Sequence, residues 1–167
     1  MDTKDYEKLF KQSSELLVVI DTNFIIMSAS NAYLEATKTV RENIVGRDIF
    51  DVFPDNPDDI TANGKSNILA SFNRVIKSKT ADTIAVIKYD IPKSESQGGG
   101  FELKYWRSCH SPILDEFNKV KYIVQHAEDV TENKVLVQQL NDDKKILKII
   151  EESEIAGERT GESGGAD

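Results

Sequence analysis

The apolar residues of the chain fall into short runs of two kinds, which differ in their spacing. Runs rich in β-branched and aromatic residues predict strands at residues 16–21, 24–30, 83–91, 101–112 and 120–127. Helical spacing of apolar positions predicts helices at residues 4–12, 32–38, 66–79 and 131–156. Two antiparallel units on either side of a helical insert predict an α+β domain with one antiparallel sheet of about five strands, flanked by an N-terminal and a C-terminal helix.

The predicted helical insert follows the second strand. Ser30 or Asn31 can cap its first helix, and Thr39 with Glu42 has the capping-box pattern for a one-turn helix. The helix at 66–79 is the clearest, because its apolar side chains share one face. These side chains are Ile68, Leu69, Phe72, Val75 and Ile76.

The last predicted strand runs straight into the terminal helix, without a flexible linker. Asp129 can accept hydrogen bonds from the free N–H groups of the first helical turn, and Glu132 can reach back to the Asp129 amide as in a capping box. An ordinary strand-to-helix turn has the same pattern. The alternative is a rigid junction in which Asp129, Thr131 and Glu132 couple movements of the sheet to the helix.

The terminal helix carries a stripe with the spacing of coiled-coil core positions. Leu136, Leu140, Leu147 and Ile150 form this stripe, and Asp143 occupies the core position between them. A lone helix that packs on its own domain shows the same stripe. The polar residues around it favour a narrow seam between two helices. We therefore predict a parallel homodimer.

The composition excludes several classes of function. A net charge of −8 and a pI near 4.9 argue against a nucleic-acid or anionic-membrane surface, because phosphates require a basic patch. No apolar run approaches the roughly 20 residues that span a bilayer, and the N-terminus lacks the apolar core of a secretory signal. The single cysteine, Cys109, excludes an internal disulfide and fits a reducing compartment. We expect a soluble cytoplasmic protein, or a piece of a larger one, without nucleic-acid partners or membrane insertion.

Three patterns that suggest chemical sites lack what those sites require. Gly98–Gly100 is not followed by the Lys-Ser/Thr pair and helix of a P-loop. The aspartates between residues 51 and 59 do not match an EF-hand, so they predict a solvated loop and no metal site. Ser108, His110 and Asp90 are the residue types of a hydrolase triad, but no positioning motif accompanies them. We therefore predict no catalytic residues.

Several short motifs follow one another in a characteristic order. They are Val19-Ile20-Asp21, Ser30-Asn31-Ala32-Tyr33, Ile44-Val45-Gly46-Arg47, Phe50-Asp51-Val52-Phe53-Pro54 and Glu128-Asp129-Val130-Thr131-Glu132. Together they resemble a PAS domain, of the group found in bacterial sensor histidine kinases. The resemblance covers residues 4–132. It implies an N-terminal flanking helix at 1–14, a PAS sensor domain at 15–130 and a signalling helix at 131–156. The Glu-, Gly- and Ser-rich composition that follows predicts a disordered tail at 157–167.

The resemblance implies a cofactor only if this chain has the residues that hold the cofactor in relatives. Flavin-binding relatives carry a reactive Cys in the stretch that matches residues 41–46, and haem-binding relatives carry a His on the helix that matches 66–79. Neither residue occurs there. We therefore predict no cofactor, with flavin photochemistry and His-ligated haem both unexpected. An unidentified small-molecule ligand and the absence of any ligand stay open as alternatives.

The resemblance also implies which side chains face a pocket between the sheet and the helices. In the family, the residue two before the Asp of the Asp-Val-Thr motif points inward. This inward position, repeated at every second residue of the last two strands, and the helix at 66–79 together predict the residues that line a pocket. They are Trp106, Ser108, His110, Ile123, Gln125, Ala127 and Phe72. Trp106 and Gln125 would supply an aromatic wall and a polar group, which small-molecule sites combine. Alternatively, the same side chains only fill a core, with His110 and Gln125 hydrogen-bonded internally.

The opposite face of these strands is too apolar to be left in water. It carries Leu103, Tyr105, Cys109, Tyr122 and Val124. The N-terminal helix can cover it with Leu9 and Phe10, and a second subunit can share that role.

These expectations describe a sensory and dimerisation module of a bacterial two-component, histidine-kinase type protein. The terminal helix would relay binding to a downstream kinase or other output domain. The chain itself lacks the phospho-acceptor helix and ATP-binding boxes of a kinase, so we do not expect an enzyme. The alternative is a stand-alone small-molecule-binding protein or an enzyme on a PAS-like scaffold, because function depends on sites rather than on folds.

Overall fold

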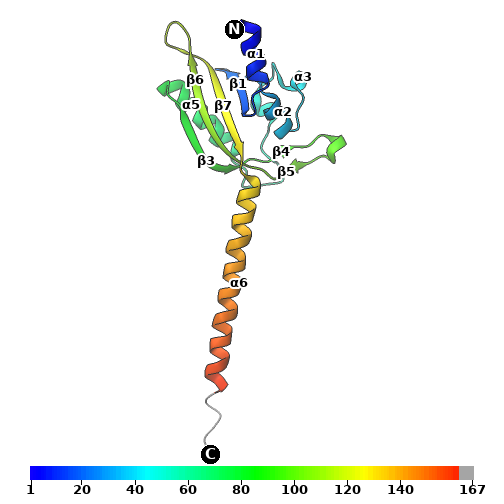
Figure 1. Cartoon of the computed structure of the whole chain (residues 1–167), viewed down its shortest axis with the longest axis vertical. Helices are drawn as coiled ribbons and strands as arrows, with labels where there is room; N and C mark the ends of the chain where they lie inside the picture. Colours follow the sequence, from blue (N-terminus) through cyan, green and yellow to red (C-terminus); the bar gives the residue numbers. More distant parts are fainter. Residues whose placement is uncertain (162–167) are drawn as a thin grey trace, which may run out of the picture. The chain divides into compact units, whose positions relative to one another are not determined.

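Five strands form one antiparallel sheet in the order β2-β1-β7-β6-β3 (Figure 1). The computed structural model describes residues 1–161. The strands of this sheet are β1 (Leu16–Asp21), β2 (Ile26–Ala29), β3 (Asp82–Lys88), β6 (Tyr105–Leu114) and β7 (Val120–Asp129), while β4 (Ile91–Pro92) and β5 (Phe101–Glu102) pair separately. The predicted α+β class and single main antiparallel sheet are confirmed.

The last strand in the sequence, β7, occupies the centre of the sheet. It pairs with β1 from Leu16↔Ala127 to Asp21↔Tyr122, and with β6 on its other side. The β6–β7 hairpin turns at Asn118, whose φ of 59° is the left-handed conformation expected there. Because β1 and β6 come from opposite ends of the folded chain, β7 joins both halves into one inner face.

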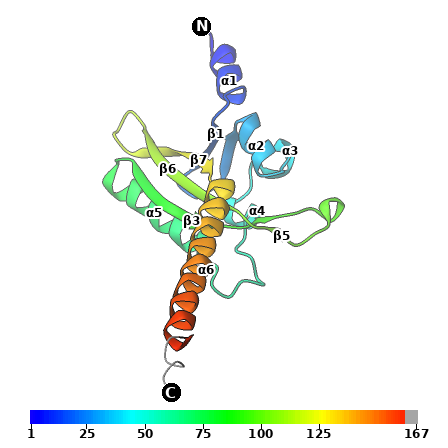
Figure 2. The same cartoon turned by 60° about the horizontal axis from the view of Figure 1, so that its bottom comes forward.

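The helical insert after β2 covers this inner face. It consists of α2 (Asn31–Ala36), α3 (Arg41–Ile44), α4 (Ile49–Val52) and α5 (Gly64–Ser78). Figures 1 and 2 both show α5 lying along β3 and β6, which it contacts. The core lies between the two layers. Its fully buried apolar residues are Val18, Ile20, Ile26, Ala29, Phe72, Val75 and Ile123.

The predicted strands at 83–91 and 101–112 are each broken in two. The break has a tertiary cause. The Asp90 carboxylate accepts a hydrogen bond from the Lys104 amide at 3.3 Å, and the Tyr89 amide donates to the Lys104 carbonyl at 3.0 Å. The Asp90 side chain thus binds the Lys104 amide in place of a backbone carbonyl of the neighbouring strand. The strand ladder is interrupted there, and β3 ends before β4 begins.

The caps of the short helices follow the prediction in part. Ser30 caps α2 by accepting a hydrogen bond from the Tyr33 amide at 3.1 Å. The prediction that Thr39 caps α3 is wrong, because the N-cap is Val40 and makes no side-chain bond. The Thr39 hydroxyl instead lies 2.9 Å from that of Thr37. The helix begins one residue later than predicted, so Thr39 lies before the cap position.

The N-terminal helix α1 (Thr3–Lys11) is not placed over the outer face of the sheet. None of its residues is buried, and Leu9 is 57% exposed. Figure 2 shows α1 projecting away beyond β1, from which the polar segment 12–15 separates it. The outer face is therefore only partly covered. Its half-buried side chains include Leu17, Val19, Tyr105, Cys109, Tyr122 and Val124.

The chain divides into two units, Met1–Thr131 and Glu132–Asp167. The helix α6 (Thr131–Gly161) extends beyond its predicted end at 156, so the tail predicted as disordered is helical up to Gly161. The rest of that predicted tail lies outside the described residues. One glycine inside a helix costs only about 1 kcal/mol, which is too little to end it. No helix in the part that the structure describes is long and apolar enough to cross a membrane.

Candidate ligand-binding site

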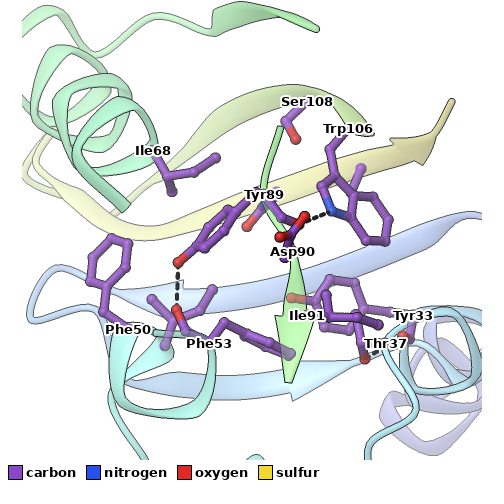
Figure 3. Close-up of a pocket in the computed structure, with 13 residues that line it drawn as sticks. Tyr33, Thr37, Phe50, Phe53, Ile68, Tyr89, Asp90, Ile91, Trp106 and Ser108 are labelled. Atoms are coloured by element: carbon purple, nitrogen blue, oxygen red, sulfur yellow. Dashed lines mark hydrogen bonds between the residues drawn. The ribbon is translucent and has the colours of Figure 1, made fainter. Parts of the chain in front are cut away.

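A cavity lies between the inner face of the sheet and the helical insert (Figure 3). Its empty space, including the opening to solvent, is about 500 Å³. The lining residues are Tyr33, Thr37, Ile49, Phe50, Phe53, Ile68, Tyr89, Asp90, Ile91, Trp106, Ser108, Gln125 and Ala127.

Aromatic side chains form much of the cavity wall. Tyr33 and Phe53 meet edge to face, with ring centroids 6.2 Å apart. The Tyr89 hydroxyl donates to the Phe53 carbonyl, and the indole N–H of Trp106 donates to the Tyr89 carbonyl at 2.8 Å (Figure 3). These bonds fix the positions of the rings, so the wall is formed before a ligand binds.

A glycine at the start of α5 makes room for Tyr89. A Cβ atom at position 64 would overlap the Tyr89 ring, so Gly64 allows the ring to lie against the helix. Burial raises the pKa of the Tyr33 and Tyr89 hydroxyls. Both phenols therefore stay neutral at physiological pH.

Asp90 is the charged residue among those that line the cavity within the described part of the chain, and it is 7% exposed. One carboxylate oxygen accepts from the Asn56 side-chain amide at 2.9 Å, and the other accepts from the Lys104 backbone amide. The Lys88 ammonium lies 3.5 Å away. The Asp90 carboxylate thus already has hydrogen-bond donors on both oxygens and a lysine counter-charge. Through these partners it joins three segments at the edge of the cavity.

Three buried polar atoms of β6 and β7 have no hydrogen-bond partner in the described structure: Ser108 Oγ, His110 Nε2 and Gln125 Oε1. His110 lies directly opposite Gln125 in the ladder, and Ser108 is the next inward residue along β6. Side chains at such positions are about 5–8 Å apart. Each unpartnered buried atom costs roughly 1–3 kcal/mol. Three together mark a place where a ligand or water completes the hydrogen bonds.

A hydrogen-bond chain behind His110 determines which ring nitrogen carries the proton. Ser71 Oγ lies 2.5 Å from Asp82 Oδ2 and 2.6 Å from His110 Nδ1. Hydrogen bonds from Arg74 and Ser71 lower the pKa of Asp82 to about 2, so its carboxylate is ionised and only accepts. The Ser71 hydroxyl therefore donates to Asp82, and the Nδ1–H of His110 donates to Ser71. We assign the lone pair to His110 Nε2.

The structure places all the predicted pocket residues in the interior, but only some of them at the cavity. Trp106, Ser108, Gln125 and Ala127 line it. The fully buried residues His110, Ile123 and Phe72 lie outside the lining. The lining residues that the sequence analysis missed come from the helical insert and the β3–β4 segment. Tyr33, Phe50 and Phe53 belong to the motifs behind the resemblance, and this overlap was the signal for them.

Ser108, His110 and Asp90 do not form a catalytic triad. His110 Nδ1 is bonded to Ser71, and the Asp90 oxygens accept from Asn56 and Lys104. The Ser71–His110 pair is not arranged as a nucleophile either. Both side chains are fully buried, and the Ser71 hydroxyl proton points to Asp82.

Asp129 connects the end of β7 to the first residue of α6. Its Oδ1 accepts from the Thr131 amide and hydroxyl at 3.0 and 2.5 Å, and its Oδ2 pairs with the Lys104 ammonium at 2.6 Å. The Thr131 hydroxyl oxygen also accepts from the Tyr105 amide at 2.9 Å. Burial raises the pKa of Asp129, but the Lys104 and Thr131 donors outweigh it and lower the pKa overall. The capping-box role of Glu132, which lies in the second unit, stays a prediction.

A family model described as PAS fold matches residues 10–135. The chain belongs to the PAS family. No curated protein sequence matches this chain.

Solved PAS-type structures share the fold at low sequence identity. The PAS domain of a protein from Colwellia psychrerythraea is 16% identical, with a TM-score of 0.59 over 77% of this chain and 97% of that one. A sensory box sensor histidine kinase from Vibrio cholerae is 15% identical, with a TM-score of 0.50 over 77% and 90%. An RNA-binding light-oxygen-voltage receptor is 16% identical, with a TM-score of 0.60 over 89% of this chain and 38% of that one. At these identities the likeness shows the PAS fold alone.

In this PAS domain, the side chains on which flavin–cysteine or haem–histidine chemistry depends do not line the cavity. Cys109 alternates with the inward residues Ser108 and His110, which places it on the outer face. His126 is exposed, with its Nε2 2.7 Å from a Glu15 oxygen. The expectation of neither cofactor stays a prediction. Within residues 1–161 there is no group of three potential metal-binding side chains, and Asp59 of the acidic loop pairs with Lys88.

Proposed function

We propose that this PAS domain is a cytoplasmic sensory and dimerisation module of a two-component, histidine-kinase type protein. It binds a small molecule in the cavity and reports the binding through α6. One observation carries the proposal: the strands that line the cavity also hold the first residue of α6. Trp106 and Ala127 line the cavity. Tyr105, which precedes Trp106, and Asp129, which lies opposite Trp106 in the ladder, both bond to Thr131.

The relay needs no flexible linker. β7 ends at Asp129 and α6 begins at Thr131. The single residue between them, Val130, is 7% exposed, and its amide donates to the Tyr105 carbonyl at 2.9 Å. A ligand that displaces Trp106 or Ala127 acts within two residues of these bonds. Such a displacement changes how the start of α6 is held, which an output domain reads as one of two states.

The remaining parts of the proposal concern partners. The apolar stripe of α6 and the partly covered outer face of the sheet are the surfaces that we assign to a homodimer. The likeness to the sensor histidine kinase from Vibrio cholerae supports a kinase or similar output domain. A net charge of −8 supports the absence of nucleic-acid partners. We propose that the chain acts by binding and not by catalysis.

Native mass spectrometry of the purified chain tests the ligand. A stoichiometric small-molecule adduct is expected on the wild type. Ala127→Leu fills the cavity and should abolish the adduct, whereas Ala85→Leu, at an exposed position of β3, should keep it. A wild type with the mass of the bare chain, or an adduct that survives in Ala127→Leu, contradicts ligand binding in this cavity.

Hydrogen exchange tests the relay. Residues 131–140 should exchange at different rates in the wild type with the adduct and in the same protein after the adduct is removed. Ala85→Leu should show the same difference. Equal exchange in the two states would contradict a relay through α6 even if the ligand is bound.

A further inference from the structure

Three unpartnered buried atoms beside the cavity restrict what it can bind: Ser108 Oγ and Gln125 Oε1 belong to lining residues, and His110 Nε2 lies on the residue opposite Gln125, outside the lining. Gln125 Oε1 is a hydrogen-bond acceptor, and His110 Nε2 is also an acceptor because its Nδ1–H is given to Ser71. The Ser108 hydroxyl can donate or accept. The single proton of the Ser108 hydroxyl can satisfy at most one of the two acceptors. A ligand without N–H or O–H donors therefore leaves at least one of them unpartnered.

The charge of the lining restricts the ligand further. Among the lining residues that the structure describes, the charged one is Asp90, and its oxygens already accept from Asn56 and Lys104. The lining offers no cationic group to a carboxylate or a phosphate. An anion would lose its hydration without a counter-charge, so an uncharged molecule is favoured.

The walls restrict the shape of the ligand. Tyr33, Phe53, Tyr89 and Trp106 line the cavity, and their rings are fixed by the contacts described above. Aromatic faces and edges favour a flat ring packed between them. Gln125 also has a side-chain N–H₂ group, which can donate to a carbonyl on the same ligand.

We infer that the cavity takes an uncharged aromatic amide or a similar flat molecule, whose N–H group faces Gln125 Oε1 and Ser108 Oγ. His110 Nε2, on the residue opposite Gln125 and outside the lining, is a further buried acceptor beside this site. The inference rests on the proposed function, since it names the ligand class of the cavity that function uses. Ordered water at the polar end, with no ligand preference, is the competing outcome.

Three probes of nearly equal shape separate the requirements. Benzamide is neutral and has N–H donors, acetophenone is neutral without donors, and benzoate is an anion without donors. Trp106 lines the cavity and is the only tryptophan of the chain, so its fluorescence reports binding directly. Benzamide should bind roughly tenfold or more tightly than the other two, because only benzamide pairs with the buried acceptors. Equal affinities for benzamide and acetophenone, tighter binding of benzoate, or no benzamide binding at millimolar concentration would each overturn the inference.

Variants locate the preference on the named atoms. Gln125→Leu and Ser108→Ala should each remove most of the benzamide preference over acetophenone. Gln97→Leu, at an exposed residue of the short 3-10 helix Glu95–Gln97 before β5, should keep it. Circular dichroism and the Tm of each unliganded variant show that it is folded. A preference that survives in both cavity variants, measured on folded protein, refutes the assigned contacts.

The proposed ligand class and the proposed sensory function can be disproved separately. If the native adduct is present and depends on the space beside Ala127, but benzamide is not preferred, the ligand class is wrong and the sensory function stands. If the wild type carries no adduct and none of the three probes changes Trp106 fluorescence, both are wrong.

Discussion

The fully buried His110 links the interior of the PAS domain to pH. Burial lowers the pKa of its imidazole to about 4, the Asp82 carboxylate opposes this shift, and Arg74 adds to it. In the unfolded chain the imidazole titrates near its ordinary value of 6.5. Between pH 6.5 and 4 the unfolded state thus binds a proton that the folded state does not. The free energy of unfolding therefore falls as the pH falls through this window.

His110→Asn should flatten this part of the stability profile. Its contribution to the wild type is up to about 3 kcal/mol between pH 6.5 and 4, an order-of-magnitude figure that follows from the shift in pKa. His126→Asn, at an exposed histidine, is the matched control and should retain the wild-type slope. Urea denaturation at several pH values measures the three slopes. The same slope in His110→Asn and the wild type would show that His110 does not titrate in this way.

Gly64→Ala should destabilise the domain by about 1–3 kcal/mol, because the added methyl group overlaps the Tyr89 ring and forces it to move. Gly157→Ala in α6 is the control, since a Cβ atom there meets nothing within 4 Å. The control should be stabilising by up to about 1 kcal/mol through helix propensity. Thermal unfolding compares the two substitutions. Equal effects at both positions would mean that the Tyr89 ring moves aside without lowering the stability of the domain.

At the scale of elements, local pattern predicted most of the fold, and tertiary bonds decided the rest. β1, β6 and α5 follow from their apolar periods, because burial on one face fixes the spacing. The break between β3 and β4 does not follow from any local pattern. It depends on Asp90, whose carboxylate takes the Lys104 amide from a distant part of the chain.

The candidate site was predictable to the same extent. The inward phase of β6 and β7 was available from the sequence, because side chains alternate strictly along a strand. The bonds from Ser71 to Asp82 and His110 were not, because they join α5, β3 and β6. Composition alone cannot tell which buried polar atoms find a partner, and this is why Gln125 was predicted only as pocket or core.

Asp129→Ala tests the junction between β7 and α6. Loss of its bonds to Thr131 should cost about 0.5–2 kcal/mol of local helix stability. The sheet should stay folded, while amide exchange across residues 133–140 should accelerate. Glu128→Ala is the matched control, because its pair with Arg107 is largely exposed and contributes little. Unchanged exchange in Asp129→Ala would remove its coupling role.

At the scale of the whole molecule, the second unit has no buried side chain among residues 132–157, the part whose burial the structure describes. From residue 132 to 157 every side chain of α6 is exposed, including Leu136, Leu140, Leu147 and Ile150. Ile146 and Ile149, beside the stripe, are exposed as well. An isolated helix gains little stability from propensity alone, so a long helix with an apolar stripe needs a partner. We propose a second copy of the same helix as this partner, which it would contact through the same residues, as a symmetric dimer requires.

Asp143 is the residue on which the dimer prediction can be tested most directly. It occupies the core position between Leu140 and Leu147, where two carboxylates would face each other across a parallel seam. Asp143→Leu should therefore lower the dissociation constant by at least about tenfold, since two buried leucines replace two charges. Lys145→Leu adds the same side chain two residues later, at an outer position of the heptad, and should leave the dissociation constant unchanged. Sedimentation equilibrium of the full chain measures both. A wild type that stays monomeric at tens of micromolar, a rough working range for such associations, would contradict the homodimer. If Lys145→Leu strengthens association as much as Asp143→Leu does, the seam does not follow the predicted stripe.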